Sequence, residues 1–121
     1  MISLDKMELL LESIVEEFPR EIFKELNGGI ILLPDLKRNK IGNNLFIMGQ
    51  YHKGGPQGRY ISIFYGSFKR VYGHLSEDDL KKKLTEVLKH EFTHHLESLA
   101  GERGLEIEDE EFINNYLRRN Q

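Results

Sequence analysis

Residues 76–102 read SEDDLKKKLTEVLKHEFTHHLESLAGE and predict one long amphipathic helix. Ser76 and Asp79 resemble a capping box, and the acidic residues that follow Ser76 suit the positive end of a helix dipole. Apolar side chains recur at helical spacing through the whole stretch. They form one stripe, made of Leu80, Leu84, Leu88, Phe92, Leu96 and Leu99. We therefore expect a helix with one buried side.

The pentad HEFTH at 90–94 matches the HExxH pattern. At about 100° of rotation per residue, His90 and His94 lie roughly 40° apart on one face of the helix, so both imidazoles can hold one metal ion. Zinc is the metal expected, because it binds neutral imidazole and lowers the pKa of a coordinated water. Glu91 flanks the same face and is the predicted general base and acid.

The remaining chain predicts a mixture of helices and strands, and hence an α+β domain. An amphipathic helix is expected over 3–18, with Ser3 or Asp5 near its start, and a short second helix from Pro19 to Leu26. The other expected elements are a buried strand at 30–33, a loop at 34–44, strands at 45–51 and 60–65 joined as a hairpin by the glycine-rich turn 52–59, an ambiguous stretch at 66–75 and a last helix at 107–119.

Size and composition limit the possible functions. The 121 residues predict a single domain, 1–121, and a net charge of −3 gives no electrostatic case for nucleic acid or an anionic membrane. The chain has no cysteine, which excludes cysteine ligands and nucleophiles and fits a reducing compartment. No apolar run is long enough to span a bilayer and the start does not read as a signal peptide. We therefore expect a cytoplasmic protein.

The sequence resembles the minimal zincin-like metallopeptidases, a family of small HExxH proteins related in architecture to the minigluzincins. The resemblance rests on HEFTHHLESLAGE with its doubled histidine, ELNGGIILLP, GRYISIFYGSF and YGHLSEDDL, and covers nearly the whole chain. It implies a zincin-like fold: an N-terminal helix, a small three-stranded mixed sheet, the HExxH helix and a C-terminal helix. It also implies one zinc ion and a peptide or protein substrate, which an edge strand, expected at 60–65, would bind by strand addition.

The third metal ligand is open, because the chain departs from the family pattern. Relatives often carry glycine and aspartate where this chain has Glu97 and Ala100. Glu97 lies on the face of His90, being seven residues on, and a continuous helix aims it at the metal. Asp109, in a DEEF context like that of the usual aspartate, is the alternative and could instead cap the last helix. Glu102, about 120° round the helix, is a poorer third option.

Several other polar side chains could support the site. His95 falls near the apolar face of the helix, so we expect a buried, hydrogen-bonded histidine that could also support the metal ligands. Oxyanion stabilisation is a possible role for a further histidine and for tyrosines, each of which packing also explains. These candidates are His74, Tyr65, Tyr72 and Tyr116.

Two functions follow from these patterns. The first is a zinc metallopeptidase in which His90 and His94 hold zinc and Glu91 moves protons. The second is a non-catalytic protein-interaction domain on a zincin scaffold with a structural or vestigial metal site, since a small domain has little wall for a deep cleft. A fourth protein ligand that closes the metal site would favour the second function.

Overall fold

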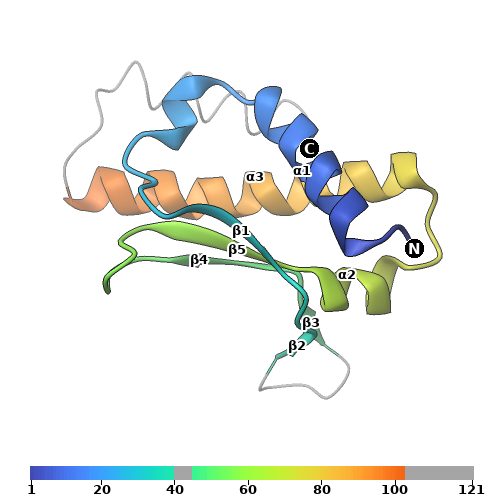
Figure 1. Ribbon diagram of the computed structural model, residues 1–121. Helices are drawn as coiled ribbons and strands as arrows, with labels where there is room; N and C mark the ends of the chain where they lie inside the picture. The colour runs from blue at the N-terminus through green and yellow to red at the C-terminus, as the bar shows by residue number, and fades with distance from the viewer. Residues whose placement is uncertain (40–44, 103–121) are drawn as a thin grey trace.

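The computed structural model describes residues 1–39 and 45–102 (Figure 1). Its elements, in chain order, are α1 (Leu4–Glu16), a 3-10 helix (Arg20–Phe23), β1 (Gly29–Leu33), β2 (Lys37–Arg38), β3 (Phe46–Ile47), β4 (Gly49–His52), β5 (Tyr60–Phe64), α2 (Tyr65–Tyr72) and α3 (Glu77–Glu102). This arrangement confirms the α+β class. The helix predicted at 107–119 lies outside the described residues.

The main sheet has three strands in the order β1-β5-β4. β1 runs parallel to β5, and β4 runs antiparallel to it as the other half of the predicted hairpin. The expected mixed sheet is therefore confirmed. The prediction that 60–65 is an edge strand is wrong, because β5 pairs on both sides. Its Ile61 and Ile63 are fully buried, and the outer edges of the sheet belong to β1 and β4.

The structure adds detail to, or differs from, several predictions for the segments around the sheet. The expected strand at 45–51 is divided at Met48: β3 pairs with β2 in a separate ribbon, and only β4 joins the main sheet. The expected loop at 34–44 therefore contains a short strand. β1 is half-buried rather than buried, since it is an edge strand. The ambiguous stretch after β5 forms α2, which begins directly at Tyr65.

The N-terminal region follows the prediction up to Phe23. Ser3 caps α1 by accepting a hydrogen bond from the Lys6 N–H at 3.2 Å. The short second helix ends at Phe23 instead of Leu26, because Glu25 adopts a left-handed backbone conformation with φ of 61°. The Leu26 N–H then donates to the Phe23 carbonyl, which closes a tight turn.

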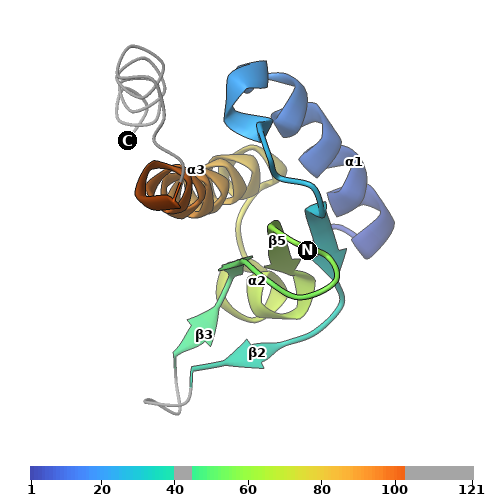
Figure 2. The ribbon, with the colours of Figure 1, turned by 90° about the vertical axis from the view of Figure 1, so that its left-hand side faces the viewer.

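The hydrophobic core lies between the sheet and the two longer helices. α1 and α3 cover the same face of the sheet (Figure 1), and the β2–β3 ribbon projects away from both helices (Figure 2). The predicted stripe of α3 is fully confirmed as buried: Leu80, Leu84, Leu88, Phe92, Leu96 and Leu99. Within the described residues, no helix has both the length and the apolar character that crossing a bilayer requires.

Candidate functional site

α3 places the HExxH pentad beside the edge strand β4. The helix starts as predicted, with the Asp79 N–H donating to the Ser76 hydroxyl at 3.2 Å. It then runs without interruption through 26 residues, a length of about 39 Å. Because its apolar stripe is buried against the sheet and α1, the adjoining face carries His90 and His94 at the border between core and solvent.

The two histidines are close enough to share one metal ion. Their Nε2 atoms lie 3.1 Å apart, and their rings stand at 86° to each other. Two nitrogens bound to one tetrahedral zinc at 2.0–2.1 Å would lie about 3.3 Å apart. Both side chains are accessible to solvent, and hence to a metal ion. The geometry thus fits two corners of a zinc site.

Glu91 lies between α3 and β4 and is only 6% exposed. Burial raises the pKa of its carboxyl above the ordinary range of a glutamate, while nearby His90 and His94 and a hydrogen bond from the Tyr51 backbone N–H act in the opposite direction. A carboxylate with a raised pKa beside a candidate metal pair is suited to accept and return a proton.

The outer edge of β4 supplies the amide that holds Glu91. The Phe64 N–H donates to the Met48 carbonyl at 2.9 Å, which shows that the carbonyl of Met48 points toward β5. Since backbone groups alternate in direction along an antiparallel strand, those of Gly49 and Tyr51 point away from β5. The Tyr51 N–H is therefore directed away from the sheet ladder and donates to Glu91.

An open groove of about 670 Å³ runs between β4 and the pentad. Its lining comes from both elements and from the end of β3: Ile47, Gly49, Gln50, Tyr51, Lys53, His90, Glu91, His94, Glu97 and Ser98. A groove of this size falls within the range of ligand-binding sites. The three fixed residues of the HExxH motif, His90, Glu91 and His94, thus share one accessible cavity.

Glu97, one of the two candidates for a third ligand, has its carboxylate beside His94. Its Oε2 lies 3.9 Å from the Nδ1 atom of His94, whereas the candidate metal position is on the Nε2 side of that ring. Within 1–39 and 45–102, no group of three or more His, Cys, Asp or Glu side chains is arranged to hold a metal. Asp109, the alternative ligand, lies outside the described residues.

His95 is fully buried, which confirms the prediction of a hydrogen-bonded core histidine. Its Nε2 lies 2.8 Å from the Lys24 carbonyl oxygen and its Nδ1 lies 2.8 Å from the Tyr51 hydroxyl. A carbonyl can only accept, so Nε2 carries the proton and Nδ1 accepts from Tyr51. Burial lowers the pKa of His95, which favours this neutral form.

Other predicted supporting residues lie away from the groove. The Tyr65 hydroxyl donates to the Ile2 carbonyl at 2.6 Å. His74 precedes α3, and His90 lies about 20 Å along that helix from its first residue, Glu77. Tyr72 packs on Phe68. None of these three lines the groove, and Tyr116 lies outside the described residues.

Two residues of the site were not predicted from the sequence. Tyr51 was assigned only to a strand, although it contacts both His95 and Glu91. Gly49 sits where α3 approaches β4 closely: a Cβ there would lie 2.8 Å from the Val87 Cγ1 atom and 3.4 Å from the Glu91 Cγ atom. A single glycine inside a strand pattern is itself a signal of such a close approach.

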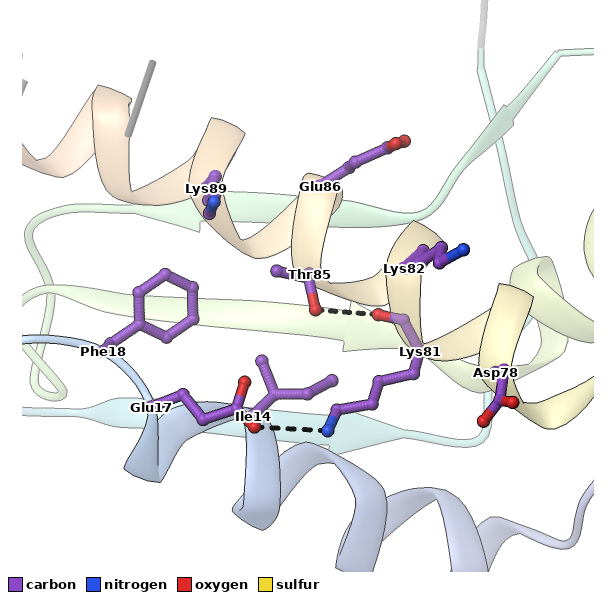
Figure 3. A pocket seen from close by; sticks show the side chains of 9 residues that line it. All are labelled: Ile14, Glu17, Phe18, Asp78, Lys81, Lys82, Thr85, Glu86 and Lys89. Carbon is purple, nitrogen blue, oxygen red and sulfur yellow. Dashed lines mark hydrogen bonds and ion pairs between the residues drawn. The ribbon is translucent and has the colours of Figure 1, made fainter. Parts of the chain in front are cut away.

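A second cavity, of about 690 Å³, lies between α1 and α3 (Figure 3). Its described lining includes no histidine, and its charges are mixed. The Lys81 ammonium donates a hydrogen bond to the Glu17 carboxylate at 3.2 Å. The Thr85 hydroxyl donates to the Lys81 carbonyl at 2.7 Å. The contact between Lys81 and Glu17 joins α3 to the end of α1, and we assign no chemistry to this cavity.

Comparison with known proteins supports the fold. A conserved hypothetical protein from Thermus thermophilus, of known structure, is 31% identical to this chain, with a TM-score of 0.73. The match covers 82% of this chain and 98% of that protein. The chain belongs to the same family. No protein-family model matches it, and neither does any curated protein.

Proposed function

We propose that this protein is a zinc-dependent metallopeptidase with a zincin-like fold. The observation that carries the proposal is the placement of His90, Glu91 and His94 at one groove. The two imidazole Nε2 atoms are 3.1 Å apart, and the adjacent carboxylate is buried against β4. An accessible pair of imidazoles beside a carboxylate of raised pKa is the combination that metal-assisted hydrolysis requires.

His90 and His94 would hold the zinc ion through their Nε2 atoms. When bound, zinc supplies Lewis-acid chemistry, which makes a water molecule acidic enough to react near neutral pH. The third ligand is either Glu97 or Asp109. Glu97 has an exposed side chain, 70% accessible, so a change of rotamer could move its carboxylate from the Nδ1 side of His94 toward the metal position.

Glu91 would carry the proton in the reaction. Its carboxylate accepts a proton from water as the oxygen attacks the carbonyl carbon of the peptide bond. It then returns that proton to the nitrogen as the carbon–nitrogen bond breaks, so that the products are a carboxylate and an amine. The bond from the Tyr51 N–H fixes the carboxylate during both transfers.

The substrate would be a peptide or a segment of a protein bound along β4. β4 is an edge strand and lines the groove beside the pentad, whereas β5 is central and cannot accept another strand. An extended peptide can add to such an edge through its main chain. The openness of the groove suits a flexible segment better than a small rigid ligand.

A non-catalytic interaction domain is the second candidate function. It is favoured by the contact between Glu97 and Nδ1 of His94, which leaves two rather than three aligned ligands in the described residues. A protein with a vestigial metal site would bind zinc weakly and hydrolyse nothing. The two candidates therefore differ in both metal affinity and turnover.

The deciding experiment compares the wild-type protein with Glu91→Gln. We expect one zinc ion per chain in both proteins, because Glu91 is not a ligand, and loss of peptide hydrolysis by at least about 100-fold in the variant. Glu77→Gln is the matched control, since Glu77 is exposed on the same helix and about 21 Å away. Equal hydrolysis by wild type and Glu91→Gln would refute the mechanism. Weak zinc binding and no hydrolysis by the wild-type protein would favour the second candidate.

A further inference from the structure

His95 joins three segments that are distant in the sequence. It lies on α3, donates from Nε2 to the Lys24 carbonyl after the 3-10 helix, and accepts at Nδ1 from the Tyr51 hydroxyl on β4. Both ring nitrogens are thus satisfied in a fully buried position. When a buried polar group makes all of its hydrogen bonds, it favours one arrangement of the neighbouring residues. A different arrangement would leave a buried donor or acceptor without a partner.

The Lys24 carbonyl is turned toward α3 by an uncommon backbone conformation. Lys24 has ψ of 126° and Glu25 has φ of 61°, the combination of a type II turn closed by the Leu26 N–H and the Phe23 carbonyl. This turn type reverses the central carbonyl relative to type I. A left-handed glutamate is rare, and here the conformation aims the acceptor at His95.

Tyr51 makes hydrogen bonds to two residues that are one turn apart on α3. Its hydroxyl donates to His95, and its backbone N–H donates to the carboxylate of Glu91. His95 follows Glu91 by four residues, so the two contacts stand one above the other on the same helix face. The side chain of Tyr51 therefore sets where its own amide lies relative to Glu91.

We propose that His95 is a positioning residue that acts through Tyr51 to hold the carboxylate of Glu91 in place. His95 is not among the residues that line the groove, and its Nδ1 atom is bonded to the hydroxyl of Tyr51, which does line it. It anchors the hydroxyl of Tyr51, which keeps the Tyr51 amide against Glu91 while the exposed side of α3 engages metal and peptide. The inference rests on the proposed function only in its consequence for turnover, since the hydrogen bonds themselves exist without metal.

The test uses Tyr51→Phe, which removes the hydroxyl but keeps the ring and the backbone amide. Tyr65→Phe is the matched control, because it also removes one hydroxyl bond, to the Ile2 carbonyl, from a partly buried tyrosine outside the site. The first measurement is hydrogen exchange of the residue 51 amide by NMR. The second is zinc affinity, and the third is the separation of kcat from KM.

In Tyr51→Phe we expect the residue 51 amide to exchange about tenfold faster, and kcat to fall about tenfold, as is typical when a support of an active-site residue is lost. Zinc affinity and KM should stay within about twofold of wild type. Tyr65→Phe should leave the exchange of the residue 51 amide, zinc affinity, kcat and KM close to their wild-type values. Wild-type exchange at residue 51 together with wild-type kcat in Tyr51→Phe would overturn the proposal. An inactive wild-type protein would contradict the proposed function instead, while the exchange rate would still decide the positioning role.

Discussion

A Cβ atom on Gly49 would lie 2.8 Å from the Cγ1 atom of Val87, closer than packed side chains approach each other. Gly49 begins β4, and Val87 lies one turn before Glu91 on α3. The same Cβ would also come within 3.4 Å of the Glu91 Cγ atom. The absence of a side chain at Gly49 therefore sets how closely the helix approaches the strand that holds its carboxylate.

Gly49→Ala should separate α3 from β4 and weaken the site. We expect a loss of about 1–3 kcal/mol of unfolding free energy from overpacking. We also expect a lower rate of the proposed peptide hydrolysis, because Glu91 moves away from the Tyr51 amide. Gly101→Ala is the control: Gly101 lies on α3, a Cβ there would meet nothing within 4 Å, and the change should be neutral or stabilising by up to about 1 kcal/mol. Chemical denaturation and an activity assay check both. Equal stability of the two variants would contradict the role of Gly49.

Replacement of the left-handed residue should stabilise the turn that faces His95. Glu25 has φ of 61°, which glycine adopts without the steric cost that a side chain meets. We expect Glu25→Gly to raise the unfolding free energy by about 0.5–1 kcal/mol, while Lys24→Gly, with φ of −55°, should lower it. Thermal unfolding measures both. If Glu25→Gly were less stable than wild type, the glutamate side chain would contribute more stability than its left-handed backbone conformation costs.

Glu91 should make the metal-free protein less stable as the pH rises. Its folded pKa is raised, mainly by burial, so the folded state binds more protons than the unfolded state between the two pKa values. Stability therefore falls through that window as pH increases. Glu91→Gln cannot titrate, so the stability of this variant relative to wild type should grow with pH and then level off above the folded pKa. Denaturation of both proteins over a pH series, with zinc removed, checks the sign. A difference independent of pH would contradict the raised pKa.

His95 should make the protein less stable as the pH falls, which is the opposite of the dependence expected for Glu91. Its folded pKa is lowered, mainly by burial, so the unfolded chain binds a proton that the folded state does not. The resulting stability is complete above the unfolded value of about 6.5 and is lost as pH falls toward the folded pKa. NMR titration should show the His95 ring neutral, with the proton on Nε2, at a pH where the unfolded chain is already protonated. A ring that titrates like an unfolded histidine would refute this assignment.

Single substitutions at the two candidate third ligands should separate them. If Glu97 completes the site, Glu97→Ala should weaken zinc binding by at least about tenfold while Asp109→Ala leaves it unchanged, and the reverse holds if Asp109 is the ligand. His94→Ala serves as the positive control, since it should abolish tight binding under either assignment. Isothermal titration with zinc measures all three. Unchanged affinity in both single variants would exclude both candidates as ligands.

Local patterns explain why much of the framework was predictable. The start of α3 at Ser76, its buried stripe and the placement of His90, Glu91 and His94 on the adjoining face depend on residues three or four apart, which helical periodicity reveals. The β4–β5 hairpin is also local. These features needed no knowledge of the rest of the chain.

The contacts that complete the site are long-range, and the sequence pattern could not predict them. The Tyr51–His95 and Lys24–His95 bonds join residues 44 and 71 positions apart. The edge position of β4 likewise depends on β1 pairing with the far side of β5. The sequence around Tyr51 predicts only a strand. Its role comes from its backbone N–H, which faces Glu91 because β4 is the edge strand of this sheet.

The hydrogen bond between His95 and the carbonyl of residue 24 also affects which amino-acid substitutions the protein can accept. The acceptor is a main-chain carbonyl, which every amino acid possesses, so the identity of residue 24 matters much less than the turn that orients it. Related chains can therefore keep this contact while residue 24 changes freely, provided that position 25 tolerates a left-handed backbone. A search for pairs of positions that change together would miss this contact, although it holds α3 to the N-terminal part of the fold.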